Sequence, residues 1–454
     1  MKKIEKRATL CLLLAAVLAV GTAIFAFRFF LNGGSWVSFA ANRHIYNSQG
    51  TLSVGQVLDR DGTALSWADG KGKRHYSDSK DIRRATLHAV GDPNGNIGTG
   101  ALTAFADQLS GYAALTGVYN PFRKGNDLYL TLSAEANVAA YHALDGHKGT
   151  VGVYNYKTGE ILCMVSNPTF DPANPPDIQD GDERYEGVYV NRLLAGTFPP
   201  GSIFKTVTLS AAIENIPDLF DREWTCTGEQ TVGDGVVTCP KAHGTMNIYD
   251  AFANSCNGVF AQLAVELGPD TLQRYAKKAG LTGSFVVSTL KTAAGTLDFS
   301  GLTANELGWS GVGQGNDMVN PCSFMTYMGA IANGGKAAVP RLILKVEGGL
   351  NLPERTKQTT RLVDADTAET LRDMLAYNVT SEYGASRFPN MTVCAKSGTA
   401  EVGGGKQPNA WFAGFLQDEE HPYAFIVLVE NGGSGANVAG SVAAKVLNTL
   451  VNGG

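Results

Sequence analysis

Three short motifs contain the residues of this chain whose types and spacing could do chemistry. In chain order they are Ser202-Ile203-Phe204-Lys205, Ser255-Cys256-Asn257 and Lys396-Ser397-Gly398. The first pairs a nucleophilic serine with a lysine base, the second supplies a hydroxyl that can relay a proton, and the third can anchor a carboxylate. Together they predict an enzyme that acylates a serine with a peptide ending in a free carboxylate.

Ser202 has the context of a nucleophile at the start of a helix. Phe198-Pro199-Pro200-Gly201 precedes it and the run 203–212 follows, a pattern that predicts a new helix. A serine at this position lies at the positive end of the helix dipole. Lys205 is close to one turn further on, so its amine is expected to reach the Ser202 hydroxyl from the same face.

The spelling of these motifs is not specific by itself. Ser-x-x-Lys also occurs at Ser77–Lys80 and Ser288–Lys291, and Lys-Thr-Gly occurs at Lys157–Gly159. The first copy lies in a charged loop, and the second follows a β-branched stretch without a helix start signal. The third joins two strand-like runs, 151–156 and 160–165, as a tight turn. Context therefore favours Ser202 over both other serines as the nucleophile and predicts a structural role for Lys157–Gly159.

The third motif extends a strand. Lys396-Ser397-Gly398-Thr399 continues the strand-like run 391–395. Ser397 and Thr399 then point to one face, and Gly398, which has no side chain, lets a ligand approach the backbone. Two hydroxyls on one face suit a terminal carboxylate.

The second motif interrupts a helical pattern. Runs 248–254 and 259–265 look helical, which leaves Ser255-Cys256-Asn257-Gly258 as a break that can expose a hydroxyl and an amide. The alternative is a helix cap formed by Ser255 or Asn257.

At these residues the chain resembles a class B penicillin-binding protein, a monofunctional peptidoglycan D,D-transpeptidase. The resemblance covers nearly everything after the first forty or so residues. Further matching segments are Gly55–Gly62, Gly125–Leu132, Gly313–Gly315, Ile331–Gly335 and Ala410–Phe415. It implies a penicillin-binding/β-lactamase-like transpeptidase domain with an antiparallel sheet between helical layers, a small pedestal domain, and no cofactor.

The order of predicted elements agrees with this α+β fold class. Early strands, a helical middle and late strands near 391, 410 and 424 predict a central sheet that pairs both ends of the chain. Ser133 is placed to cap a helix that runs through Leu144. We expect an anchor at 1–31, a pedestal at 39–130 and the transpeptidase domain at 131–454. The segment before residue 130 is too short for the glycosyltransferase domain of a bifunctional relative.

The implied reaction starts with a lysine base. Lys205, buried and close to Lys396, should have a lowered pKa and take the Ser202 proton as the hydroxyl attacks the penultimate D-Ala carbonyl. The backbone N–H groups of Ser202 and Thr399 would hold the oxyanion, and Ser255 would protonate the leaving D-Ala.

Substrate binding is assigned to the remaining motif residues. Asn257 would align the stem peptide, and Lys396, Ser397 and Thr399 would hold its terminal carboxylate. An amine of a neighbouring stem peptide would then take the acyl group. A β-lactam mimics the dipeptide and would acylate the same serine.

The amino terminus predicts a membrane anchor. Residues 8–27 contain no charge, and twenty helical residues span a hydrocarbon core of about 30 Å. Four basic side chains and one acidic one precede this run, which places the amino terminus in the cytoplasm and the catalytic domain outside the cell membrane. A cleavable signal peptide ending near Ser38-Phe39-Ala40 is the competing interpretation, and the length of the run favours an uncut single-pass anchor.

Charge limits the partners. The net charge is −5, and residues 1–28 carry five basic and one acidic side chain, so the remainder is at −9. This argues against nucleic acid. The expected partners are peptidoglycan stem peptides, β-lactams, the membrane and a polytopic glycan polymerase.

The seven cysteines show no metal-binding spacing and no Cys-x-x-Cys, so no metal site is predicted. Cys11 lies in the span, and four others have apolar or motif-adjacent positions typical of buried thiols: Cys163, Cys256, Cys322 and Cys394. Cys226 and Cys239 flank a Gly-rich hairpin, where a disulfide is an open question. His243, which has no evident acid partner, is expected to anchor a loop.

Two other function classes remain open. A D,D-carboxypeptidase or a β-lactamase of the same superfamily would share all three motifs, because the motifs specify acylation and not the acceptor. A penicillin sensor or polymerase partner without turnover is the other alternative, although every motif residue is present.

Overall fold

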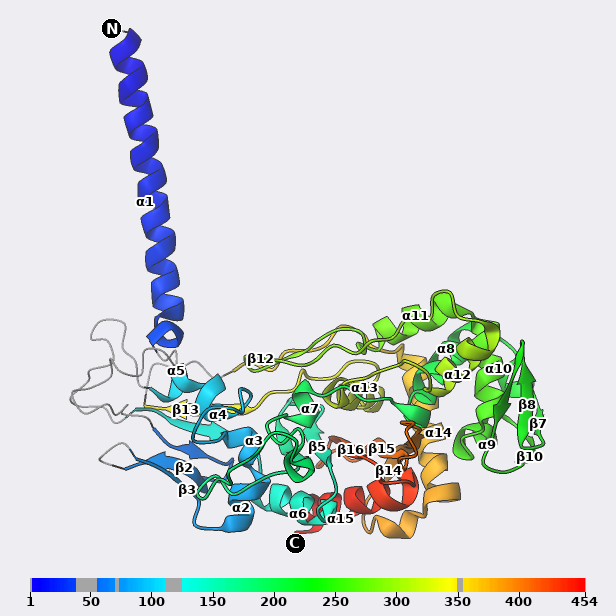
Figure 1. The fold of residues 1–454 in the computed structure, drawn as a ribbon. Helices are drawn as coiled ribbons and strands as arrows, with labels where there is room; N and C mark the ends of the chain where they lie inside the picture. Colours follow the sequence, from blue (N-terminus) through cyan, green and yellow to red (C-terminus); the bar gives the residue numbers. More distant parts are fainter. Residues whose placement is uncertain (1, 38–54, 70–72, 111–124, 349–353, 454) are drawn as a thin grey trace.

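The computed structural model describes residues 2–37, 55–69, 73–110, 125–348 and 354–453, and of residues 30–37 only the backbone. Figure 1 shows a long amino-terminal helix, a small lobe near its end and a larger lobe that carries the rest of the chain. The helix is α1 (Lys2–Val37). Its segment Lys2–Phe29 has the length and composition to cross a membrane, and the apolar window within it is fully exposed. The proposed processing site at 38–40 lies outside the described residues.

The small lobe contains a five-stranded sheet with the order β13-β4-β1-β2-β3. Four strands come from the predicted pedestal: β1 (Val57–Leu58), β2 (Ala64–Ala68), β3 (Arg74–Tyr76) and β4 (Asp127–Leu130). The edge strand β13 (Ile343–Glu347) pairs antiparallel with β4, although it lies more than 200 residues further along the chain. Four short helices accompany the sheet: α2 (Lys80–Ala85), α3 (Leu87–Val90), α4 (Ala101–Ala104) and α5 (Ala106–Leu109).

The large lobe is organised by a second five-stranded sheet. Its order is β14 (Val393–Ala400), β15 (Asn409–Leu416), β16 (Tyr423–Val429), β5 (Gly149–Asn155) and β6 (Ile161–Asn167). All neighbours pair antiparallel. The late strands thus join the early hairpin through β16 and β5, which confirms the prediction that the sheet pairs both ends of the chain. Lys157–Gly159 forms part of the turn between β5 and β6, as predicted.

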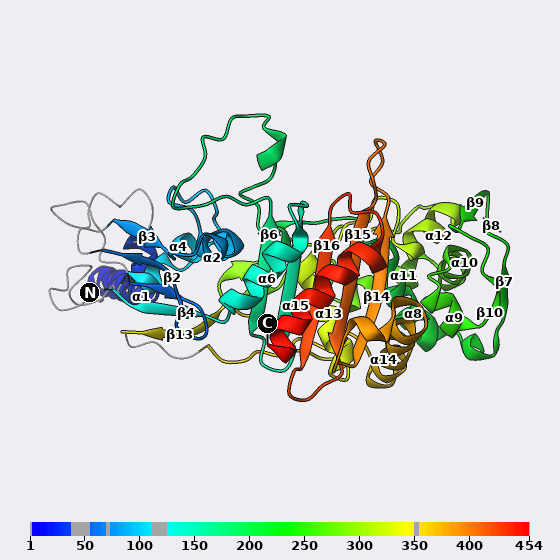
Figure 2. The same ribbon diagram turned by 90° about the horizontal axis from the view of Figure 1, so that it is seen from below.

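Helices cover both faces of this sheet. Val151 and Val153 of β5 pack in one apolar cluster with α6 (Ala134–Leu144) and α15 (Gly440–Asn452). Tyr154, the next residue of the same strand, lies in a second cluster with Met325 and Met328 of α13 (Pro321–Ala332). Alternating side chains enter opposite layers, so both faces need apolar residues and the strands are almost wholly apolar. Figure 2 shows α6 and α15 crossing in front of the sheet.

The α+β fold with an antiparallel sheet between helical layers is therefore confirmed. Ser133 caps α6 by accepting a hydrogen bond from Ala136 N, as predicted. The helical middle of the chain comprises α7 (Arg192–Ala195), α8 (Lys205–Asn215), α9 (Ile248–Ala253), α10 (Asn257–Leu267), α11 (Pro269–Lys278), α12 (Ala304–Val312) and α14 (Ala365–Asn378).

Short ribbons and turns complete the large lobe. The ribbons are β7 (Trp224–Cys226) with β10 (Gly244–Met246), β8 (Glu229–Val232) with β9 (Gly235–Thr238), and β11 (Val286–Val287) with β12 (Leu290–Lys291). The β8–β9 pair is the predicted Gly-rich hairpin. The short helical turns are η2 (Glu183–Tyr185), η3 (Gly201–Ile203), η4 (Leu219–Asp221), η5 (Val379–Tyr383), η6 (Ala385–Arg387) and η7 (Gly435–Ala439). In Figure 2 the β7–β10 ribbons lie at the end of the molecule away from the small lobe.

Candidate active site

A cavity of about 910 Å³ brings the three motifs together. Its walls include Ser202 from the first motif, Ser255 and Asn257 from the second, and Ser397 and Thr399 from the third. The motifs are separated by up to about 200 residues in the chain, so their meeting is a property of the fold. The cavity is large enough for a peptide segment or a drug-sized ligand.

The other copies of the motifs lie elsewhere. Ser77 precedes α2 in the small lobe, Ser288 lies between β11 and β12, and Lys157 is in the β5–β6 turn. None of them lines the cavity. Sequence context had selected the same serine and the same Lys-Ser-Gly segment.

Ser202 lies in the short 3₁₀ turn η3, and α8 begins only at Lys205. The expected regular helix from Ile203 therefore starts later than predicted. Gly201 explains the tighter turn: its φ is +54°, and a Cβ there would lie 2.7 Å from the Thr399 carbonyl oxygen. Only glycine combines this conformation with so close an approach to β14. The turn thus holds Ser202 against the strand of the third motif.

Lys205 is fully buried, and its amine is directed toward the second motif. Its Nζ forms hydrogen bonds with the Ser255 carbonyl oxygen (2.6 Å), Ser255 Oγ (3.1 Å) and Asn257 Oδ1 (2.7 Å). Among the described residues, Ser202 Oγ has no hydrogen bond with this amine. The expected direct contact between Lys205 and Ser202 is therefore not formed in this structure, because the amine bonds instead to Ser255 and to Asn257, the first residue of α10.

The two motif lysines have lowered pKa values. Burial, followed by the positive charge of Lys396, lowers the pKa of Lys205 well below its usual value. Burial also lowers the pKa of Lys396 to about 7, while Glu382 acts in the opposite direction. Burial disfavours the charged form of both amines because it removes the water that would solvate the charge. The lowered pKa expected for Lys205, with Lys396 as a contributor, agrees with these shifts.

Ser255 forms the break between α9 and α10. Its φ of +56° is unusual for a residue with a side chain and turns the chain sharply before α10. The N-cap of α10 is Cys256, which makes no side-chain capping bond, so the alternative of a cap by Ser255 or Asn257 is not what the structure has. Asn257 Nδ2 donates to the Thr238 carbonyl oxygen at 2.8 Å. This bond orients the amide so that Oδ1 faces Lys205.

The third motif has two differently exposed faces. Ser397 and Thr399 line the cavity, as the alternation of a strand requires, whereas Lys396 is fully buried and does not line it. Lys396 Nζ instead donates to the Ser397 carbonyl oxygen at 3.1 Å and contacts Tyr383 Oη at 3.5 Å. The hydroxyls of Ser397 and Thr399 can therefore bind a carboxylate directly, as expected. Lys396 cannot, because its side chain is buried away from the cavity.

The missing side chain of Gly398 allows another part of the chain, and not a ligand, to pack against β14. A Cβ at this position would lie 3.1 Å from Ile203 Cγ2 and 3.2 Å from Ile203 N. The glycine lets β14 approach η3, the turn that carries the nucleophile. This differs from the expected role of admitting a ligand, although both depend on the missing side chain.

Two functional candidates were missed by sequence reasoning. Tyr383 Oη accepts a hydrogen bond from Ser397 N and lies 3.1 Å from Ser397 Oγ. Asp317 lines the cavity, and its buried Oδ2 has no hydrogen-bond partner among the residues that the structure describes. Burial raises the pKa of Asp317 to about 7, and a hydrogen bond with Ser310 opposes the shift. Tyr383 had no local signal, whereas Asp317 follows the Gly313–Gly315 segment that the resemblance included.

The cysteines answer the open disulfide question. Cys226 and Cys239 are free thiols in the structure, and Cys163, Cys256, Cys322 and Cys394 are buried as expected. His243 Nδ1 lies 3.4 Å from Cys226 Sγ, so this histidine contacts a thiol in place of an acidic partner.

Comparison with known proteins decides the family. The family model described as the penicillin-binding protein transpeptidase domain matches residues 149–452, about two thirds of the chain. The chain belongs to the penicillin-binding protein transpeptidase family. The match begins at β5 and ends in α15, so it contains the central sheet and all three motifs.

Relatives in this family are D,D-transpeptidases by name. The peptidoglycan D,D-transpeptidase PbpA of Mycolicibacterium smegmatis is 29% identical over 353 residues, which are 71% of this chain and 70% of the relative. PbpA of Mycobacterium tuberculosis is 28% identical over 362 residues, 72% of each chain. These relatives confirm the resemblance to class B penicillin-binding proteins.

Solved structures agree with the fold. The D,D-transpeptidase domain of a peptidoglycan glycosyltransferase from Eggerthella lenta has a TM-score of 0.74 and 27% identity, covering 88% of this chain and 98% of that one. Penicillin-binding protein A of M. tuberculosis, solved as a ceftriaxone acyl-enzyme complex, has a TM-score of 0.76 at 23% identity, with the same coverage. The similarity includes both lobes, because it extends over most of the chain.

Proposed function

We propose that this protein is a serine-type peptidoglycan D,D-transpeptidase that crosslinks stem peptides through an acyl-enzyme on Ser202. The observation that carries the proposal is the buried Lys205 amine, whose pKa is lowered and which bonds to Ser255 and Asn257 at the cavity that Ser202 lines. An amine whose pKa is lowered, at a cavity lined by a hydroxyl, is the basic requirement of nucleophilic catalysis by serine.

The contacts of Lys205 leave its amine able to act as a base. Two of its three partners, the Ser255 carbonyl oxygen and Asn257 Oδ1, can only accept hydrogen bonds. Lys205 Nζ also donates to Ser255 Oγ at 3.1 Å. A hydroxyl both donates and accepts, so Ser255 Oγ can reverse this bond and donate to the lone pair once the amine is neutral. Burial favours the same neutral form.

Acylation follows from this arrangement. Lys205 takes the Ser202 proton as Oγ forms a bond to the penultimate D-Ala carbonyl, with the contact tightening once substrate is bound. The C–N bond to the terminal D-Ala then breaks, and the proton passes through Ser255 to the leaving amine. The amine of a second stem peptide attacks the acyl carbonyl, loses a proton to the same base and releases Ser202. The product is a new peptide bond between two stem peptides.

An oxyanion hole is assigned to the N–H groups of Ser202 and Thr399. β14 is the edge strand of its sheet, and Gln314 Nε2 donates to the Thr399 carbonyl oxygen at 3.4 Å. In an antiparallel strand the N–H and the C=O of one residue point to the same side, so the Thr399 N–H is directed away from β15. It then faces the turn of Ser202, whose N–H belongs to the first, unsatisfied turn of a helix.

Substrate positioning is divided among the other motif residues. Ser397 and Thr399 hold the terminal carboxylate, with the Lys396 charge acting from behind the strand through Ser397. Asn257 aligns the stem peptide through the amide that Thr238 orients. β-Lactams enter as covalent inhibitors, since they mimic the dipeptide and acylate Ser202.

The cellular setting is proposed from the amino-terminal helix. We infer that α1 is an uncut single-pass anchor that places the catalytic domain outside the cell membrane, next to a polytopic glycan polymerase. The apolar helix Lys2–Phe29 and its basic flank support the orientation.

The test uses the purified full-length protein in detergent, with a lipid-linked stem-peptide substrate and an amine acceptor. A transpeptidase releases D-Ala and forms crosslinked dimer, and Ser202→Ala abolishes both. Release of D-Ala without dimer would assign a D,D-carboxypeptidase, and rapid release of hydrolysed penicillin would assign a β-lactamase. Wall crosslinking in cells that is fully restored by Ser202→Ala would assign a role without turnover.

A further inference from the structure

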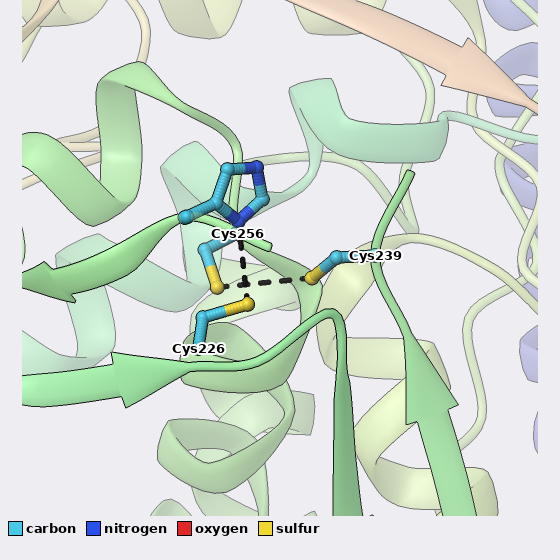
Figure 3. Close-up of side chains that lie close together, drawn as sticks. Cys226, Cys239 and Cys256 are labelled. Carbon is cyan, nitrogen blue, oxygen red and sulfur yellow. Dashed lines mark hydrogen bonds between the residues drawn. The ribbon is translucent and has the colours of Figure 1, made fainter. Parts of the chain in front are cut away.

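Three cysteines and a histidine meet at one point beside the second motif. Figure 3 shows Cys226, Cys239 and Cys256 with their sulfurs converging, together with an imidazole. The sulfur atoms of these three cysteines and a ring nitrogen of His243 all lie within 4.8 Å of one another. We propose that these four residues form a structural Zn²⁺ site that fixes the Ser255-Cys256-Asn257 loop.

The distances within the cluster fit a tetrahedral zinc site. Zinc binds thiolate sulfur at about 2.3 Å and histidine nitrogen at about 2.0–2.1 Å, so a tetrahedron has S···S edges of about 3.8 Å and S···N edges of about 3.5 Å. Cys239 Sγ and Cys256 Sγ are 3.8 Å apart, and Cys226 Sγ is 3.4 Å from His243 Nδ1. A disulfide needs an S–S distance of about 2.0 Å. The spacing is therefore that of ligands around an ion.

The donor set selects the metal. Three sulfurs and one imidazole nitrogen form the Cys₃His set of structural zinc sites, and soft sulfur ligands disfavour Mg²⁺ and Ca²⁺. Four protein ligands fill the tetrahedron and leave no open position for water or substrate. The proposed ion is thus structural and takes no part in bond making.

The ligands come from four segments that meet at the short ribbons and the start of α10. Cys226 ends β7, Cys239 follows β9, His243 precedes β10, and Cys256 is the N-cap of α10. The β7–β10 ribbon pairs only three residues on each strand, and most of those side chains are exposed or half-buried. Two-stranded ribbons of this size are marginally stable. A shared metal would tie both ribbons to α10.

A simpler explanation of the cluster is that its cysteines are ordinary buried thiols. The other buried cysteines of the chain test this explanation. Cys163, Cys322 and Cys394 are also buried. In the described part of the chain, however, the cluster of Cys226 is the one group of three or more metal-binding side chains whose ligand atoms converge. Ordinary buried thiols are therefore dispersed in this protein, whereas these three are gathered around a histidine.

The cluster is connected directly to the proposed catalytic loop. Cys256 lies between Ser255 and Asn257 in the chain. The Asn257 N–H donates to Cys239 Sγ at 3.2 Å, an outer hydrogen bond of the type that orients metal ligands. Cys239 follows Thr238, whose carbonyl oxygen holds the Asn257 amide. A metal at the cluster would thus fix the side chains that bond to Lys205.

The spacing explains why the sequence did not reveal the site. Twelve residues separate Cys226 from Cys239, three separate Cys239 from His243, and twelve separate His243 from Cys256. No pair of cysteines has the two- to four-residue spacing of common zinc motifs. The prediction that the cysteines bind no metal is replaced by this proposal.

Metal content is the first test. Full-length protein purified in detergent without chelator is expected to contain one zinc per chain by elemental analysis. Cobalt-substituted protein should show thiolate-to-cobalt charge-transfer bands and the d–d bands of a tetrahedral site. Cys226→Ala, Cys239→Ala and His243→Ala should lose the metal, whereas the matched buried variants Cys163→Ala and Cys322→Ala keep it.

Several results would overturn the site. They are wild-type protein that contains no zinc and gives no cobalt spectrum, a disulfide among Cys226, Cys239 and Cys256 in non-reducing peptide maps, or zinc retained by all three ligand variants. The first two measurements use the wild-type chain, so they remain decisive if the variants fail to fold. None of these results depends on enzymatic activity. They therefore test the metal site independently of the proposed transpeptidase activity.

The positioning role, which rests on the proposed function, needs a second readout. Zinc removal by a strong chelator, well below the unfolding temperature, should lower the rate of acylation by a fluorescent penicillin at least about tenfold. Far-UV circular dichroism should stay unchanged, and added Zn²⁺ should restore the rate. A lower melting temperature with an unchanged acylation rate would show that the metal stabilises the ribbons without positioning the loop.

Discussion

Lys205 and Asn257 are joined by a 2.7 Å hydrogen bond from the buried amine to the side-chain oxygen. This bond connects the residue that starts α8 with the residue that starts α10. It places the proposed base in contact with the second motif and shows that the first two motifs form one hydrogen-bonded unit. The third motif approaches this unit from the edge strand β14.

Replacing the base should remove most of the acylation activity. Lys205→Met keeps the length of the side chain and removes the amine, so acylation by a fluorescent penicillin should slow about 10²- to 10⁴-fold. The second-order rate constant measures this, with the melting temperature as a check on folding. Lys277→Met, at an exposed lysine of α11, is the matched control. A rate for Lys205→Met within threefold of wild type would remove Lys205 from the mechanism.

The pH dependence of acylation should report on the two lysines. The neutral form of Lys205 is the active one, so the acylation rate should rise with pH through the pKa of this amine. The positive charge of Lys396 helps to lower that pKa. Lys396→Met removes the charge, so the pKa of Lys205 rises and the acid limb of the rate profile moves to higher pH. Movement to lower pH would contradict the assignment of Lys205 as the base.

The free energy of unfolding should depend on Asp317. Its folded pKa of about 7 lies above the unfolded value, so the folded state binds more protons between about pH 4 and 7. The cost of burying this group therefore grows as the pH rises through that window. Asp317→Asn should stabilise the protein more at pH 7.5 than at pH 5, as measured by chemical denaturation. The exposed variant Asp145→Asn should show no such difference, and equal gains at both pH values for Asp317→Asn would contradict the prediction.

Tyr383 should affect substrate binding more than folding. Its hydroxyl accepts the Ser397 N–H, and Tyr383→Phe leaves that donor without a partner. An unsatisfied donor costs about 1–3 kcal/mol, which corresponds to approximately 5- to 150-fold weaker substrate binding if the whole cost is borne by the complex. We expect a higher KM for carboxylate-bearing stem peptides with a smaller change in kcat. Unchanged kinetics would mean that the Ser397 backbone tolerates the loss without moving.

The sequence predicted the site where the signal was local. The prolines and glycine before Ser202 and the break at Ser255 selected the residues that line the cavity. Strand alternation placed Ser397 and Thr399 on one face, and it equally required Lys396 to point to the other face, a consequence that the predicted carboxylate grip overlooked.

Features that depend on distant chain segments could not be predicted. Tyr383 reaches Ser397 from the end of η5, the turn that follows α14, and β13 joins the sheet of the small lobe from beyond residue 340. The Cys226 cluster depends on two ribbons folding back onto α10. No local sequence pattern predicts these long-range contacts, because they depend on how the helices and strands pack.

The most direct measurement is the site of penicillin attachment. Folded full-length protein treated with bocillin and digested with trypsin should carry one adduct, on the peptide that contains Ser202, and Ser202→Ala should remove it. Such a result would establish the nucleophile on which the mechanism depends. Failure of the folded protein to react, or an adduct on any other residue, would contradict the account.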